Sequence, residues 1–91
     1  MMEQTKAIIL ALLADQGYMI SQQRRIIIDT LCNIQYIGSV EDFWVTIRTH
    51  HHVSWATVHK TVRLLEHLGC IVRTKVYNRH QEYTLAIPAV D

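Results

Sequence analysis

The periodicity of the apolar residues changes at Gly69, and this change limits the folds that the chain can adopt. Before Gly69, apolar residues recur at intervals of three and four, which is the period of an amphipathic helix. After it the period becomes two, so that Val72 and Thr74 share one face of a strand. Glycine at this place suits the left-handed residue that ends many helices. We therefore expect helices first and a β-hairpin last.

Capping residues define the helices. Three serines, Ser21, Ser39 and Ser54, precede apolar periodic segments, and a serine hydroxyl there accepts a hydrogen bond from a free backbone N–H. In the second helix we expect Ile34 on the buried stripe, with Ile27 and Leu31. Four helices are predicted, over about residues 4–16, 22–33, 40–49 and 54–68, followed by a hairpin over 70–87 that turns at 78–80.

Helix, turn, helix and then a hairpin is the order of a winged helix-turn-helix domain. The predicted fold class is therefore α+β, mainly helical, with an N-terminal helix, three further helices and a two-stranded β-hairpin as the wing. Other small α+β folds share this order. Ninety-one residues make one domain, 1–91.

Composition indicates a globular domain without a membrane segment. Hydrophobic residues are 49% of the chain and charged residues 19%, a balance typical of a packed core. The longest apolar run, residues 7–14, is too short to span a bilayer and reads as a core helix. Cys32 and Cys70 lie far apart in apolar surroundings, so we expect two buried thiols and a reducing, cytoplasmic location.

The positive charge is concentrated in one third of the chain. The net charge is only +1, but residues 54–80 hold five basic residues against one acidic residue, Glu66. Such a local excess favours a polyanion as partner, although a solvated surface without a partner shows the same pattern.

The helix over 54–68 is the main candidate site, and we expect it in the major groove of duplex DNA. Lys60 and Arg63 lie on its polar face, where either side chain neutralises a phosphate or donates to guanine O6 and N7. On the same face, His59 is expected either to hydrogen-bond a base or to stack on the sugar-phosphate edge. Ser54 and Thr57 begin the helix, where free backbone N–H groups hold a phosphate and the Thr57 methyl meets a thymine.

Further candidates lie outside this helix. Arg73, Lys75 and Arg79 lie on or near the hairpin, where a wing contacts the DNA backbone or the minor groove, and Arg25 begins the second helix. Two placements remain open for Trp55, which either stacks on a sugar or packs against the third helix.

Four segments resemble the DNA-binding domain of the ferric uptake regulator family, over about residues 17–85. The resemblance lies in GYMISQQRRIIIDTL from residue 17, SVED from residue 39, ATVHKTVRLLEHLGCIV from residue 56 and EYTL from residue 82. Their order and spacing match the family, and the resemblance implies a winged helix that binds DNA and regulates transcription.

The chain departs from the family at several positions. His59 and Lys60 stand where the family has a tyrosine and an arginine that contact DNA, so a different target sequence is implied. Ile37 and Thr84 align with two metal ligands of the family. The family's dimerisation and metal domain lies beyond the wing, and this chain ends at Asp91, so we expect the DNA-binding domain alone, without a metal or cofactor. The histidines of residues 50–52 are expected in a solvated loop.

These observations favour a sequence-specific transcription regulator that binds double-stranded DNA as a homodimer. The apolar first helix is nominated as the dimer interface, and four phosphate contacts per protomer predict a slope of log K against log salt of about −3.6. The alternative is a winged-helix protein-interaction module, an adaptor in a larger assembly. No catalytic motif, small-molecule site or membrane partner is indicated, so an enzyme is not expected.

Overall fold

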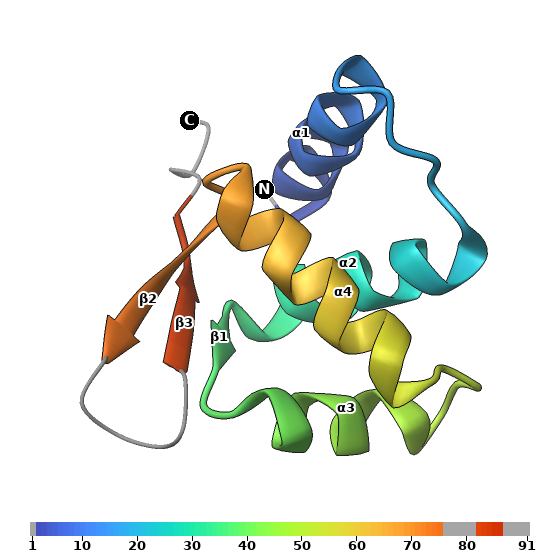
Figure 1. Ribbon diagram of the computed structural model, residues 1–91, viewed down its shortest axis with the longest axis vertical. Coiled ribbons are helices and arrows are strands. Elements are labelled where there is room, and N and C mark those ends of the chain that lie inside the picture. Colours follow the sequence, from blue (N-terminus) through green and yellow to red (C-terminus); the bar gives the residue numbers. More distant parts are fainter. Residues whose placement is uncertain (1, 76–81, 87–91) are drawn as a thin grey trace.

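The structure is a computed structural model that describes residues 2–75 and 82–86, with side chains for residues 4–74 and 82–86. Four helices and three strands occur in the described ranges, and the α+β, mainly helical winged-helix class is confirmed (Figure 1). The elements are α1 (Met2–Asp15), α2 (Gln22–Ile34), β1 (Tyr36–Ile37), α3 (Val40–Arg48), α4 (Trp55–His67), β2 (Ile71–Lys75) and β3 (Glu82–Leu85).

Serine caps begin three of the helices, as predicted. The hydroxyl of Ser21 accepts from the Arg24 N–H at 3.2 Å, and that of Ser39 from the Asp42 N–H at 3.0 Å. Ser54 caps α4 in the same way. The chain leaves α4 through Gly69, whose φ of 80° lies in the left-handed region where a side chain is strained.

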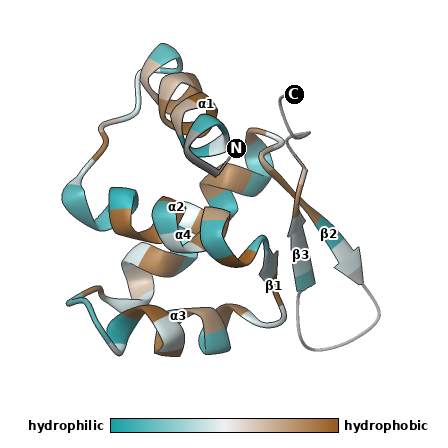
Figure 2. Cartoon of the chain, turned by 180° about the vertical axis from the view of Figure 1, so that it is seen from behind, coloured by the Kyte–Doolittle hydropathy of each residue, from teal (hydrophilic) through white to brown (hydrophobic). Residues whose placement is uncertain are grey.

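The core lies where α2 and α4 cross. The apolar faces of these helices are buried against each other and against α3, while α1 covers α2 from the other side (Figure 1). Hydrophobic and hydrophilic residues alternate along α2 and α3, as expected for helices with one face in a core (Figure 2). The two thiols, Cys32 and Cys70, are buried, and burial raises the pKa of both.

The sheet has one strand more than the predicted hairpin. Its order is β1-β3-β2, all antiparallel, and the register sets Thr84 beside Tyr36 on one side and beside Val72 on the other. The two-residue strand β1 was not predicted because two residues are too few to show an alternating pattern. It follows Gln35, whose left-handed φ of 64° ends α2.

One expectation, about the end of α2, needs correction, and another falls on residues that the structure does not describe. Ile34, expected on the buried stripe of α2, is 45% exposed: it is the last residue of the helix, and the buried residues of α2 end with Leu31 and Cys32. The predicted turn at 78–80 lies outside the described residues. No helix among the residues described is long and apolar enough to cross a membrane.

Candidate nucleic-acid interface

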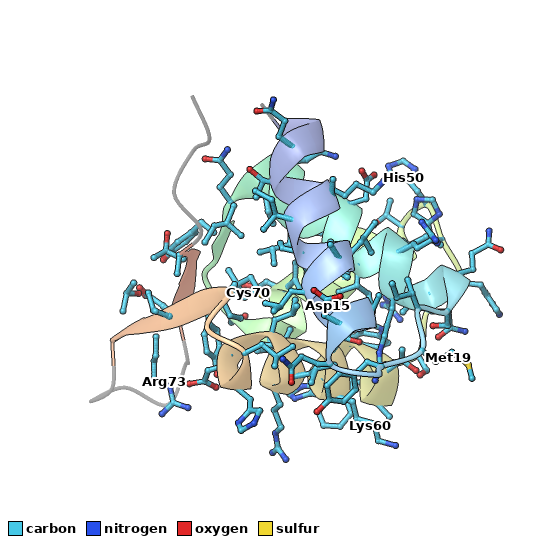
Figure 3. All side chains as sticks on the ribbon, turned by 90° about the horizontal axis from the view of Figure 1, so that it is seen from above. Asp15, Met19, His50, Lys60, Cys70 and Arg73 are labelled. Carbon is cyan, nitrogen blue, oxygen red and sulfur yellow. The ribbon has the colours of Figure 1, made fainter. Side chains whose placement is uncertain are left out.

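The two faces of α4 divide as the sequence predicts. Val58, Val62 and Leu65 are buried in the core. On the opposite face Lys60 and Arg63 are exposed, and neither forms an ion pair with any other described residue. Figure 3 shows the Lys60 side chain pointing away from the body of the molecule. The helix therefore presents two unpaired cations to solvent.

The start of α4 has a hydrogen-bonded cap. The Ser54 hydroxyl accepts from the Thr57 N–H at 3.1 Å, and the two hydroxyls of Ser54 and Thr57 are 2.7 Å apart. The Thr57 N–H, which the sequence offered to a phosphate, is therefore occupied. The N–H groups of Ser54, Trp55 and Ala56 have no intrahelical acceptor and still point out of the helix end.

We expect Ser54→Ala to lower the free energy of unfolding by about 1 kcal/mol, because the Thr57 N–H loses its acceptor. Urea unfolding followed by circular dichroism measures the change. Ser54→Asp, which keeps an acceptor at this position, serves as the matched control and is expected to retain most of the stability. A loss of equal size in both variants would contradict a capping role.

Trp55 and His59 form a stacked pair on one flank of α4. Their ring centroids are 3.8 Å apart at an interplanar angle of 41°. Burial lowers the pKa of His59, and the nearby Arg63 lowers it further, with Glu41 acting in the opposite direction. The imidazole is therefore neutral near pH 7. Its Nε2 atom is buried and has no hydrogen-bond partner among the described residues, so in this conformation Nε2 does not face a DNA base.

A second tryptophan, Trp44 of α3, holds the segment that leads into α4. The indole Nε1 of Trp44 donates to the Val53 carbonyl at 3.0 Å, and the Arg48 guanidinium lies 4.5 Å from the centre of the Trp44 ring. The residue pattern does not predict this role, because it depends on how the segment before α4 passes α3. The contact holds the residue just before the Ser54 cap.

Arg73 of β2 forms an ion pair with Glu66 in the last turn of α4. Its Nη2 atom is 3.4 Å from Oε2 of Glu66, and its guanidinium lies 5.9 Å from the ring of Tyr83. The Tyr83 hydroxyl donates to the other Glu66 oxygen at 3.3 Å. This cluster fixes the sheet against α4, and Figure 3 shows Arg73 and Lys60 pointing to the same side. The charge of Arg73 is partly balanced by Glu66.

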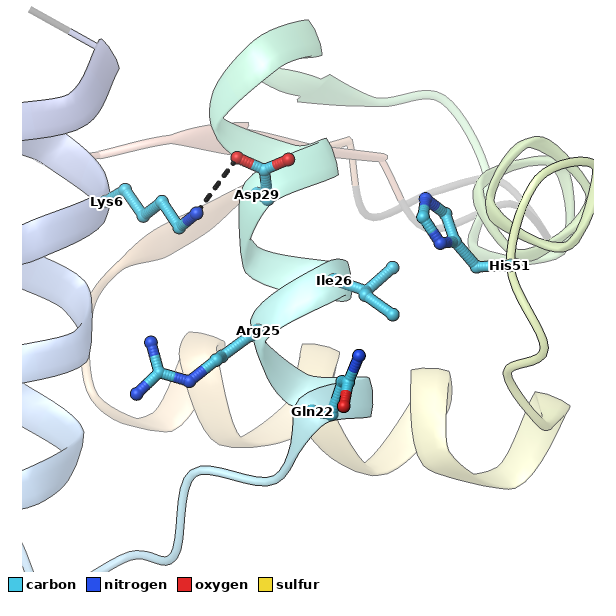
Figure 4. A pocket seen from close by; sticks show the side chains of 6 residues that line it. All are labelled: Lys6, Gln22, Arg25, Ile26, Asp29 and His51. Carbon is cyan, nitrogen blue, oxygen red and sulfur yellow. Dashed lines mark hydrogen bonds and ion pairs between the residues drawn. The ribbon is translucent and has the colours of Figure 1, made fainter.

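The remaining basic candidates are Lys75, Arg79 and Arg25. The side chain of Lys75 and the whole of Arg79 lie outside the description. Arg25 is exposed and extends from α2 toward α1, where it lines a shallow hollow of about 320 Å³ with Lys6 and Asp29 (Figure 4). Lys6 and Asp29 form an ion pair at 3.2 Å. The structure therefore does not show Arg25 directed at α4.

The histidine run lies in the connection between α3 and α4. All three histidines of residues 50–52 are exposed, and His50 lies on the opposite side of the molecule from Lys60 (Figure 3). Within the described ranges, no group of three or more histidine, cysteine, aspartate or glutamate side chains is arranged to hold a metal ion.

The model of the ferric uptake regulator family matches residues 15–89. Among solved structures, a manganese uptake regulator is 26% identical with a TM-score of 0.68, and the match covers 85% of this chain and 57% of that one. A zinc-bound manganese uptake regulator is 26% identical with a TM-score of 0.69, covering 89% and 61%. The chain thus spans about three fifths of the length of these structures. No curated protein matches it.

Proposed function

The chain belongs to the ferric uptake regulator family, and on this basis we propose that it is a transcription regulator that binds double-stranded DNA in a sequence-specific way. In this proposal α4 enters the major groove and the β2–β3 hairpin acts as the wing beside it. The protein is a regulator and not an enzyme, and it acts in the cytoplasm.

The observation that carries this proposal is the outer face of α4. Lys60 and Arg63 stand there one turn apart, with no carboxylate paired to either within the described structure. Ala56, one turn before Lys60, is small enough to let the helix approach the groove floor. Two cations beside a small residue suit a helix that meets phosphates and base edges together.

The proposed DNA contacts remain those that the sequence predicted, with their roles adjusted to the geometry. Ser54 and Thr57 contribute as the capped helix start, and His59 contributes through its ring edge and not through Nε2. Arg73 is fixed by Glu66, so its main effect is to orient the wing. The full set is Arg25, Ser54, Thr57, His59, Lys60, Arg63, Arg73, Lys75 and Arg79.

We further propose that the protein binds a two-fold operator as a homodimer. A single winged helix contacts only a few base pairs, and a second copy doubles the readout. The first helix, α1, is the nominated interface, because a DNA-bound winged helix uses it least. Ile8 of α1 is a large apolar side chain that remains exposed in the single chain.

Selection of bound sites from random duplex DNA by the purified protein tests the proposal. We expect enrichment of one motif with two-fold symmetry, and a slope of log K against log salt of about −3.6 for each protomer. Failure to enrich any sequence at low salt would overturn the proposal. A stable protein partner found in that case would support the adaptor alternative.

A further inference from the structure

Trp55 is a large aromatic side chain that is exposed to solvent at the start of α4. It is 46% exposed, so the fold does not require its ring for the core. At 100° per residue, Ala56 lies about 100° and Arg63 about 80° around the helix from Trp55. Arg63 lies about 12 Å further along the helix axis, whereas Ala56 is the next residue. The indole therefore borders the outer face of α4 beside the small residue Ala56.

The ring of Trp55 is held in place before any partner arrives. His59 lies four residues later, on the same flank of the helix, and stacks on the indole with 3.8 Å between centroids. His59 is itself partly buried, which limits its own movement. A side chain that is already ordered loses less conformational entropy on binding than a free one. The stacked pair is thus an ordered apolar surface at the edge of the proposed interface.

Thymine is the base that such a surface distinguishes. In the major groove only thymine presents a C5-methyl group, and apolar side chains contact it. The open N–H groups at residues 54–56 lie in the same turn as Trp55, where a phosphate beside that base can be held. Resting on the proposed DNA binding, we infer that Trp55 contacts the methyl group of a thymine in the operator, and that His59 is the residue that positions it.

The test uses the duplex that the wild-type protein selects, together with copies in which single thymidines are replaced by deoxyuridine, which lacks the methyl group. We expect one position in each half-site at which the replacement weakens wild-type binding about fourfold, the ratio that corresponds to burial of one methyl group. Trp55→Ala is expected to weaken binding to the thymidine duplex by a similar factor and to remove the difference at that position. The salt slope is expected to stay the same, because no phosphate contact is lost.

Tyr36→Ala is the matched control. Tyr36 is an aromatic residue of β1 with 47% exposure, so the variant removes an equally open ring from another element. We expect it to retain the discrimination between thymidine and deoxyuridine. Two variants test whether His59 positions Trp55. We expect His59→Ala to reduce the discrimination between thymidine and deoxyuridine while its circular dichroism spectrum stays unchanged. His59→Phe, which keeps a ring at this position, is expected to retain the discrimination.

The outcomes separate this inference from the proposed function. Wild-type binding that does not respond to deoxyuridine at any position overturns the inference while DNA binding stands. The same holds if Trp55→Ala keeps the thymidine preference. A wild-type protein that selects no duplex overturns the proposed function and this inference together.

Discussion

Replacement of Lys60 and Arg63 by alanine together reduces affinity for the selected duplex by about 100-fold or more and leaves the protein folded. Each side chain is expected to contribute at least tenfold through a phosphate or a guanine edge, since such contacts are worth about 1–3 kcal/mol. If both cations neutralise phosphates, the slope of log K against log salt becomes shallower by about 1.8 for each protomer. Both side chains are exposed and unpaired within the described structure, so their removal costs the fold little.

A variant with the same change of net charge provides the control for this result. Asn33→Asp with Val45→Glu lowers the net charge by the same two units at exposed positions of α2 and α3, outside both α4 and the nominated dimer helix α1, and is expected to bind within a few fold of wild type. Fluorescence anisotropy at several salt concentrations measures affinity, and thermal unfolding checks the fold. Equal losses in the two double variants would show that only overall charge matters, and would refute a specific role for α4.

Leu65→Ala is expected to lower the free energy of unfolding by about 3 kcal/mol. Leu65 lies on the inner face of α4 with 0% exposure, and truncation of a leucine in such a site removes apolar burial and leaves a cavity. A domain of this size has a total stability of roughly 5–15 kcal/mol, so the loss is a large share of it. The effect arises because α4, the helix proposed to contact DNA, also contributes buried residues to the core.

Leu64→Ala is the control for this substitution. Leu64 is the preceding residue of the same helix and is only partly buried, so we expect a clearly smaller loss. Urea unfolding measures both variants with the same baseline. A loss below about 1 kcal/mol for Leu65→Ala would mean that the core relaxes to fill the space. At temperatures where Leu65→Ala remains folded, its DNA affinity is expected to match wild type.

The helices were predictable because their determinants are local. In α4 the cap, the apolar stripe and the terminal glycine all lie within sixteen residues, from Ser54 to Gly69. The outward direction of Lys60 and Arg63 followed from the same periodicity. Ile34 was misplaced because periodicity does not show where a helix stops, and the left-handed Gln35 ends α2 without a glycine.

Contacts between elements were not predictable from the pattern. The bond from Trp44 to the Val53 carbonyl depends on how α3 and α4 cross. The cluster of Arg73 and Glu66 depends on where β2 meets the end of α4, so a residue assigned to DNA proved to be paired within the protein. The stack of Trp55 on His59 has helical spacing, but its exposure depends on the neighbours that surround it.

The small strand β1 has a mechanical consequence. Through its pairing with β3, and through the bond from the Leu85 N–H to the Gln35 carbonyl at 3.1 Å, the base of the wing is attached to the chain between α2 and α3. On its other edge, the Ala86 N–H donates to the Cys70 carbonyl at 2.9 Å. In the described residues, the base of the wing is thus fixed on both edges to the body of the protein. If the wing contacts DNA as proposed, a bend or groove narrowing that displaces its base pulls on the segment between α2 and α3.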